Sequence, residues 1–115
     1  MPARGTDGFT VVTIRGELGI AAAPALREQL LILLASGANR IVVDLSRVTF
    51  CDSSGLAVLV GAARRASLLG GALRLAAAPP PVLIVLRLTG LDTHFETFPT
   101  VPAATVAAAA PAATV

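Results

Sequence analysis

Two hydrophobic patterns alternate along the chain, one with the spacing of strands and one with the spacing of helices. Strand-like segments alternate apolar with polar residues or run through β-branched ones, and helix-like segments repeat apolar residues every three or four positions. The strand-like segments cover residues 9–18, 40–46, 72–77 and 94–98, and the helix-like segments cover residues 24–37, 54–69 and 82–88. This order predicts an α/β fold with a mainly parallel, four- to five-stranded sheet and helices packed against it.

The segments differ in how deeply they should be buried. Residues 9–18, FTVVTIRGEL, alternate as a strand with one buried face does, whereas residues 40–46, RIVVDLS, suit a central strand covered on both faces. The predicted inner face of the helix at 24–37 consists of Leu26, Leu30, Leu33 and Leu34. The predicted inner face of the helix at 54–69 consists of Leu56, Leu59, Val60 and Ala63, opposite Arg64 and Arg65.

Length and composition divide the chain into one domain with two flanking segments. A chain of 115 residues has room for one modest core. We assign residues 1–8 to an N-terminal segment that has room for a short edge strand, and residues 9–98 to the domain itself. Residues 99–115 are rich in alanine and proline and are expected to form a C-terminal helix or a loose tail.

The charge and the cysteine count narrow the function classes. All nine basic residues are arginine, they are scattered along the chain, and the net charge is +2. The sequence has no Tyr or Trp for base stacking, so we expect no direct binding of nucleic acid. The single Cys51 excludes an internal disulfide and a cysteine-based zinc site, and it reads either as a small core residue or as a thiol activated beside a helix start. We find no signal peptide and no membrane-spanning stretch, and therefore expect a cytoplasmic protein without membrane insertion.

The segment TFCDSSGLAVLV places Asp52, Ser53, Ser54 and Gly55 between a strand and a helix. A helix start needs one capping side chain, which Asp52 or Ser53 can supply, and this alone would explain much of the motif. The unpaired N–H groups at a helix start also favour negative charge, so a hydroxyl left free there could accept a phosphate. Capping and a phosphorylation site both remain open on these residues alone.

The chain resembles the STAS domain of anti-sigma factor antagonists. The matching segments are VVTIRGEL (11–18), APALREQL (23–30), RIVVDLSRVTFCDSSGLAVLVGAARRA (40–66), GGALRL (70–75) and LTGL (88–91). The resemblance implies a protein that, when dephosphorylated, binds an anti-sigma factor serine kinase and frees a sigma factor. It implies no catalysis and no cofactor of the protein's own, phosphorylation of Ser53 by the kinase, and removal of that phosphate by a metal-dependent serine phosphatase. Ser54 would then serve as the capping or turn residue, and the partner-binding turn would consist of Asp52, Ser54, Gly55 and Leu56.

The sequence departs from the family pattern in three places. Gly19 stands where members commonly carry an aspartate after GEL, which leaves open a degenerate antagonist that binds without being phosphorylated. The segment before residue 9 is short for the strand usually found there. The helix after the prolines carries Leu83 and Ile84 where basic residues are usual, and we expect this pair to contact a partner or a second copy in a homodimer.

Two other function classes fit the sequence less well. A STAS regulatory module of a membrane transport system is the alternative to an antagonist, and the DSSG motif argues against it because such modules often replace the serine pair. A hydrolase triad of Ser53, His94 and either Asp44 or Asp92 lacks the G-x-S-x-G nucleophile motif. We therefore expect no enzyme.

Overall fold

The fold is a five-stranded sheet in which the strands follow their order in the sequence. The computed structural model describes residues 3–4 and 8–106. The strands are β1 (Ala3–Arg4), β2 (Thr10–Leu18), β3 (Arg40–Cys51), β4 (Ala72–Ala76) and β5 (Glu96–Phe98). Strand β1 is antiparallel to β2, and the other neighbouring pairs are parallel. The predicted α/β class with a mainly parallel sheet is confirmed.

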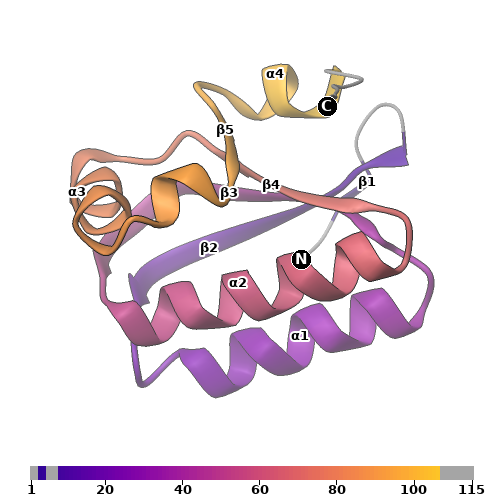
Figure 1. The fold of residues 1–115 in the computed structure, drawn as a ribbon, viewed down its shortest axis with the longest axis horizontal. Helices are drawn as coiled ribbons and strands as arrows, with labels where there is room; N and C mark the ends of the chain where they lie inside the picture. Colours follow the sequence, from indigo (N-terminus) through magenta and orange to yellow (C-terminus); the bar gives the residue numbers. More distant parts are fainter. Residues whose placement is uncertain (1–2, 5–7, 107–115) are drawn as a thin grey trace.

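Helices cover both faces of this sheet. They are α1 (Ala23–Ala35), α2 (Ser53–Leu68), α3 (Pro80–Thr89), the 3₁₀ turn η2 (Leu91–Thr93) and α4 (Val101–Val106). Helices α1 and α2 lie side by side on one face, and α4 lies on the opposite face (Figure 1). Helix α3 ends at Gly90, whose φ of 76° gives the left-handed cap that glycine adopts without strain.

The main core lies between the sheet and helices α1, α2 and α3. Its fully buried side chains include Leu18, Leu30, Ile41, Leu45, Leu56, Leu59, Leu75 and Leu86. A smaller cluster on the other face consists of Phe9, Val42, Ala76 and Ala104. Because β3 and β4 contribute to both clusters, the sheet is covered on both sides where the sequence showed a continuous apolar run.

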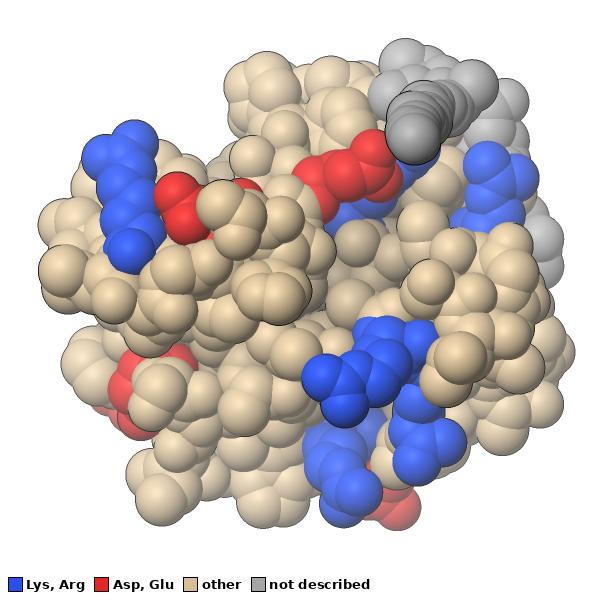
Figure 2. Space-filling model, viewed as in Figure 1, with Lys and Arg blue, Asp and Glu red and all other residues tan. Residues whose placement is uncertain are grey.

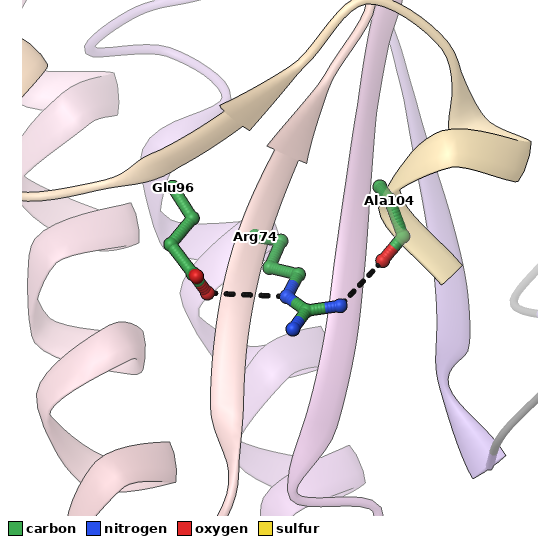
Figure 3. A network of polar contacts seen from close by, with 3 residues as sticks. All are labelled: Arg74, Glu96 and Ala104. Carbon is green, nitrogen blue, oxygen red and sulfur yellow. Dashed lines mark hydrogen bonds and ion pairs between the residues drawn. The ribbon is translucent and has the colours of Figure 1, made fainter. Parts of the chain in front are cut away.

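Arg74 joins β4 to the elements that cover the second face. It is 4% exposed, its Nε donates to Glu96 Oε1 at 3.1 Å, and its Nη1 donates to the Ala104 carbonyl at 2.8 Å (Figure 3). Its guanidinium also lies over the rings of Phe9 and Phe98, 4.5 and 5.3 Å from their centroids. These contacts explain how a charged side chain is accommodated in a buried strand.

Several predicted boundaries and faces differ from those observed. The strand predicted at 40–46 continues to Cys51 because Val48 and Cys51 also reach the core, and shifts in register along β2 keep the two strands paired. The strand predicted at 94–98 begins only at Glu96. On α2 the buried stripe includes Ala62 and Ala66, whereas Val60 and Ala63 are half-buried, because the helix is rotated toward α1.

The flanking segments are only partly described. Strand β1 lies within residues 1–8 and pairs with β2 at the edge of the sheet. Helix α4 lies within residues 99–115, and positions 107–115 of the expected tail lie outside the described residues. We propose residues 9–98 as the domain unit, extended in the structure by the α4 contacts.

Candidate functional site

The DSSG turn lies where strands β2 and β3 end and helix α2 begins. The Asp52 N–H donates to the Leu18 carbonyl at 3.1 Å, which fixes the end of β3 beside the end of β2. Ser53 is the first residue of α2 and is exposed, and Ser54 is half-buried. The turn therefore presents the Ser53 hydroxyl to solvent at the carboxyl edge of a parallel sheet.

Asp52 caps helix α2. Its backbone is extended, with φ −129° and ψ 177°, and its Oδ1 accepts hydrogen bonds from the backbone N–H groups of Ser54 at 2.8 Å and Gly55 at 3.2 Å. Of the two roles expected for Ser54, that of the cap is excluded, because Asp52 supplies the capping side chain, and that of a turn residue fits its N–H, which donates to Asp52. Neither serine hydroxyl is hydrogen-bonded to another residue of the part of the chain that the structure describes.

Gly55 and Leu56 serve the core and not the surface. A Cβ at Gly55 would lie 2.3 Å from the Leu18 carbonyl oxygen, so only glycine allows α2 to approach β2 this closely. Leu56 is fully buried. The expectation that these two residues contact a partner is corrected on this ground: their side-chain positions face inward, where no other protein can reach them.

Gly19 lies directly against the cap. A Cβ at this position would be 2.9 Å from Asp52 Oδ2 and 3.5 Å from Phe50 Cε2, so position 19 and the DSSG turn form one surface. An aspartate here would place a second carboxylate beside that of Asp52. Glycine keeps this side of the turn free of further charge.

Two exposed apolar residues come from the same strand ends as the turn. Ile20 is 74% exposed just after Gly19, and Phe50 is 50% exposed two residues before Asp52. Neither residue is among those predicted from the sequence to lie at this site. The available signal was the alternation in TFC, where an inward Cys51 implies an outward Phe50. These residues give the turn an apolar border.

The apolar pair predicted on α3 divides between core and surface. Leu83 is half-buried and packs against the main core, whereas Ile84 is 53% exposed. Leu88, which the sequence analysis did not single out for contact, is 82% exposed on the same helix. The exposed apolar surface of α3 therefore consists of Ile84 and Leu88, with Leu83 only at its edge.

Cys51 is an inert core residue. It is 5% exposed, and its thiol lies 3.7 Å from the Asp52 carbonyl oxygen. Burial, and secondarily the negative charge of Asp52, raise the pKa of the thiol from 9.0 to about 11. The alternative of an activated thiol at the helix start is thereby removed.

The residues considered for a hydrolase triad do not assemble. His94 lines one hollow with Val60, Ala63 and Ser67, in the middle and second half of α2, whereas Ser53 begins that helix. Asp44 accepts from the Thr13 hydroxyl and the Ser46 N–H within the sheet region. Among the described residues there is no cluster of three His, Cys, Asp or Glu side chains suited to a metal ion.

Comparison with known proteins places this chain in one family. The chain matches the family model of the STAS domain over residues 1–104. It is 36% identical over 80 residues to the anti-sigma-B factor antagonist of Bacillus subtilis (strain 168), which covers 70% of this chain and 72% of that protein. The chain belongs to the STAS domain family.

Solved structures agree with this assignment. An anti-sigma factor antagonist from Mycobacterium paratuberculosis shares 31% of its sequence with this chain, with a TM-score of 0.78 and coverage of 90% of this chain and 89% of that one. The Bacillus cell fate determinant SpoIIAA in its phosphorylated form has the same fold, with a TM-score of 0.66 at 24% identity, and covers 84% of this chain and 88% of that one. Of the helices in the described part of this chain, none has the length and apolar character needed to cross a membrane.

Proposed function

We propose that this protein is an anti-sigma factor antagonist that binds an anti-sigma factor serine kinase in its dephosphorylated form and thereby frees a sigma factor. Phosphorylation of Ser53 ends that binding. One observation at the turn carries the proposal. Asp52 caps the helix, and the exposed Ser53 hydroxyl makes no hydrogen bond to another described residue. The relatives are antagonists of anti-sigma factors, which supports an anti-sigma factor as the partner, and the family resemblance adds that this factor is a serine kinase.

The site explains how one phosphate would disrupt docking without unfolding the domain. A phosphoserine adds about −1.5 to −2 charges at neutral pH. At position 53 that charge would adjoin the Asp52 carboxylate and the apolar side chains of Ile20 and Phe50. A partner surface complementary to the apolar border would then have to desolvate a dianion, while the N-terminal end of the helix tolerates the added charge.

The chemistry of the switch belongs to the partners. The kinase transfers the γ-phosphoryl group of ATP to Ser53 Oγ, the hydroxyl proton passes to a base of the kinase, and ADP leaves. A metal-dependent serine phosphatase hydrolyses the ester with water and restores the hydroxyl. The antagonist contributes the positioned serine and the docking surface, and we place this exchange in the cytoplasm.

The test is phosphorylation by the kinase with single-serine variants as matched controls. Incubation with the cognate kinase and ATP should add one phosphate, mapped to Ser53 by mass spectrometry of peptides. Ser54→Ala should still be modified, and Ser53→Ala should not. In a pull-down with the kinase, Ser53→Ala should bind as the unmodified protein does, and Ser53→Asp should bind at least tenfold more weakly. Modification confined to Ser54, or full binding by Ser53→Asp, would contradict the proposal.

A second candidate, an antagonist that binds but is not phosphorylated, is favoured by one specific observation. Gly19 stands where the family resemblance implies an aspartate, and its position lies against Asp52. Binding to the kinase without any phosphate added to the parent chain would identify this form. Restoration of phosphorylation by Gly19→Asp would then assign the loss to position 19.

A further inference from the structure

The outward surface of helices α1 and α2 carries an apolar groove bordered by arginines. The groove has a volume of about 640 Å³. Its apolar lining comes from Leu30, Leu31, Ala57, Val58, Ala62 and Leu68. Arg27 of α1 and Arg64 and Arg65 of α2 complete it. Figure 2 shows basic side chains gathered over these two helices.

The three arginines of the groove form no ion pair with any described residue. The one ion pair among the described residues joins Arg74 to Glu96 on the other side of the sheet. Arg27, Arg64 and Arg65 are exposed, and no carboxylate of a described residue lies within 4 Å of them. The same face therefore combines apolar area with unneutralised positive charge.

The apolar area extends beyond the groove itself. Ile32 is 61% exposed and lines an adjoining hollow with Arg27, Leu31 and the exposed Glu28. Leu68 is 81% exposed at the far end of α2. An apolar groove between two helices, with arginines on both of its sides, fits an amphipathic helix with carboxylates beside its apolar face.

We propose that the α1–α2 groove, formed around Arg27, Arg64 and Arg65, is a second docking surface that binds an acidic amphipathic helix of a partner protein. Within the groove, Arg64 lies 11 residues after Ser53, about 16 Å along the helix axis at 1.5 Å per residue, whereas Ala57 lies about one helical turn after Ser53. The charged end of the groove is therefore distant from the phosphorylation turn. The proposal does not depend on the function assigned to Ser53. The groove gives the protein a way to hold one partner while another engages the turn.

The groove chemistry disfavours the other occupants. A second copy docked through this face by a two-fold axis would bring the three arginines of one chain against those of the other. A nucleic acid would need stacking aromatic residues, and the groove lining has leucine, valine and alanine instead. A helix with apolar and acidic residues matches both parts of the surface.

The test uses two synthetic peptides with the same apolar face. One is an 18-residue fluorescein-labelled helix with leucines on one face and glutamates beside them, and the other replaces each glutamate by lysine. Binding to the full chain is measured by fluorescence anisotropy at 50 and 300 mM NaCl. The glutamate peptide should bind, more weakly at the higher salt, and the lysine peptide should bind at least tenfold more weakly.

Charge-matched variants locate the binding. The double variant Arg64→Glu, Arg65→Glu should bind the glutamate peptide at least tenfold more weakly. The control Arg47→Glu, Arg87→Glu makes the same change in net charge at exposed positions outside the groove and should stay within twofold of the parent. Circular dichroism verifies that each variant is folded, and Ser53→Ala should leave peptide binding unchanged.

Three results would overturn the proposal. One is equal binding of the lysine peptide, and another is equal loss in both double variants. The third is a glutamate peptide that does not bind while phosphatidylglycerol vesicles or a single-stranded oligonucleotide do. In that case the Arg64→Glu, Arg65→Glu variant should lose the vesicle or oligonucleotide binding, which would assign the surface to that ligand instead.

Discussion

At the scale of one residue, the protonation of the Cys51 thiol reports on the surroundings of the DSSG turn. It lies at the end of β3, next to the Asp52 cap, and its pKa is raised to about 11 by burial and by the neighbouring carboxylate. The sequence contains no Lys and no Tyr. Cys51 is therefore the one side chain that titrates between pH 9 and 11, since arginine remains charged to above about pH 12.

We predict that the protein loses stability as the pH rises from 9 to 11. The unfolded thiol has its pKa near 9.0 and the folded thiol near 11, so the folded state holds the proton more tightly. The stabilising contribution is fully present below pH 9 and is lost as the pH passes through the folded value. Urea unfolding followed by circular dichroism at pH 8, 9.5 and 11 measures this decline. Cys51→Ala should show a nearly constant free energy of unfolding over the same range, and an equal decline in that variant would contradict the assignment.

Single residues also show where sequence reasoning reached its limit. The DSSG motif identified a helix start with a spare hydroxyl, but Asp52, Ser53 and Ser54 are all chemically able to cap it. The choice depends on the backbone angles of Asp52, which are fixed by its hydrogen bond to Leu18 from another strand. That contact joins residues far apart in the sequence, so the local pattern could not reveal it.

Helix α2 shows the same limit at the scale of an element. Its existence and approximate span followed from the apolar spacing, but the rotation that buries Ala62 and Ala66 depends on the position of α1. The two glycines of α2 were indistinguishable by type, and the structure separates them. A Cβ at Gly55 would contact the Leu18 backbone, whereas a Cβ at Gly61 would meet nothing within 4 Å.

These glycines give opposite predictions for the same substitution. Gly55→Ala should lower the free energy of unfolding by about 1–3 kcal/mol, because α2 must move away from β2 to relieve the overlap. Gly61→Ala should raise it by about 0.5–1 kcal/mol, because alanine is favoured in a helix interior. Urea unfolding of both variants beside the parent measures the two shifts. A stabilising Gly55→Ala would show that the close approach to Leu18 does not constrain the helix.

At the scale of the whole molecule, α4 packs on the second face of the sheet, where its Ala104 carbonyl accepts a hydrogen bond from the buried guanidinium of Arg74. The alanine-rich sequence of α4 gave no sign of this role, because the helix contributes small residues and a backbone carbonyl to the contact. Arg74 within ALRLAA reads as an ordinary surface arginine until Phe9 and Phe98 are placed on the same face. The layered fold was thus predictable from the strands and the longer helices, and the packing of the short C-terminal helix was not.

We predict unequal effects for the two partners of the Arg74–Glu96 pair. Arg74→Leu should lower the free energy of unfolding by about 2–3 kcal/mol, because the buried Ala104 carbonyl and the two ring faces lose their partner. Glu96 is half exposed, so Glu96→Ala should cost about 0–1 kcal/mol. Urea unfolding compares the two variants. An equal loss in both would mean that the ion pair, and not the carbonyl and rings, carries the contribution of Arg74.

The helix is capped by the Asp52 carboxylate and not by a serine hydroxyl, and under the proposed function this has a genetic consequence. A mutation that removes Ser53 takes away no bond on which the helix depends. The altered protein would accumulate at normal levels and go on sequestering its target after the stop signal has been sent. Such alleles should therefore be dominant over the wild type, whereas alleles that change Gly55 should be recessive through loss of the folded product.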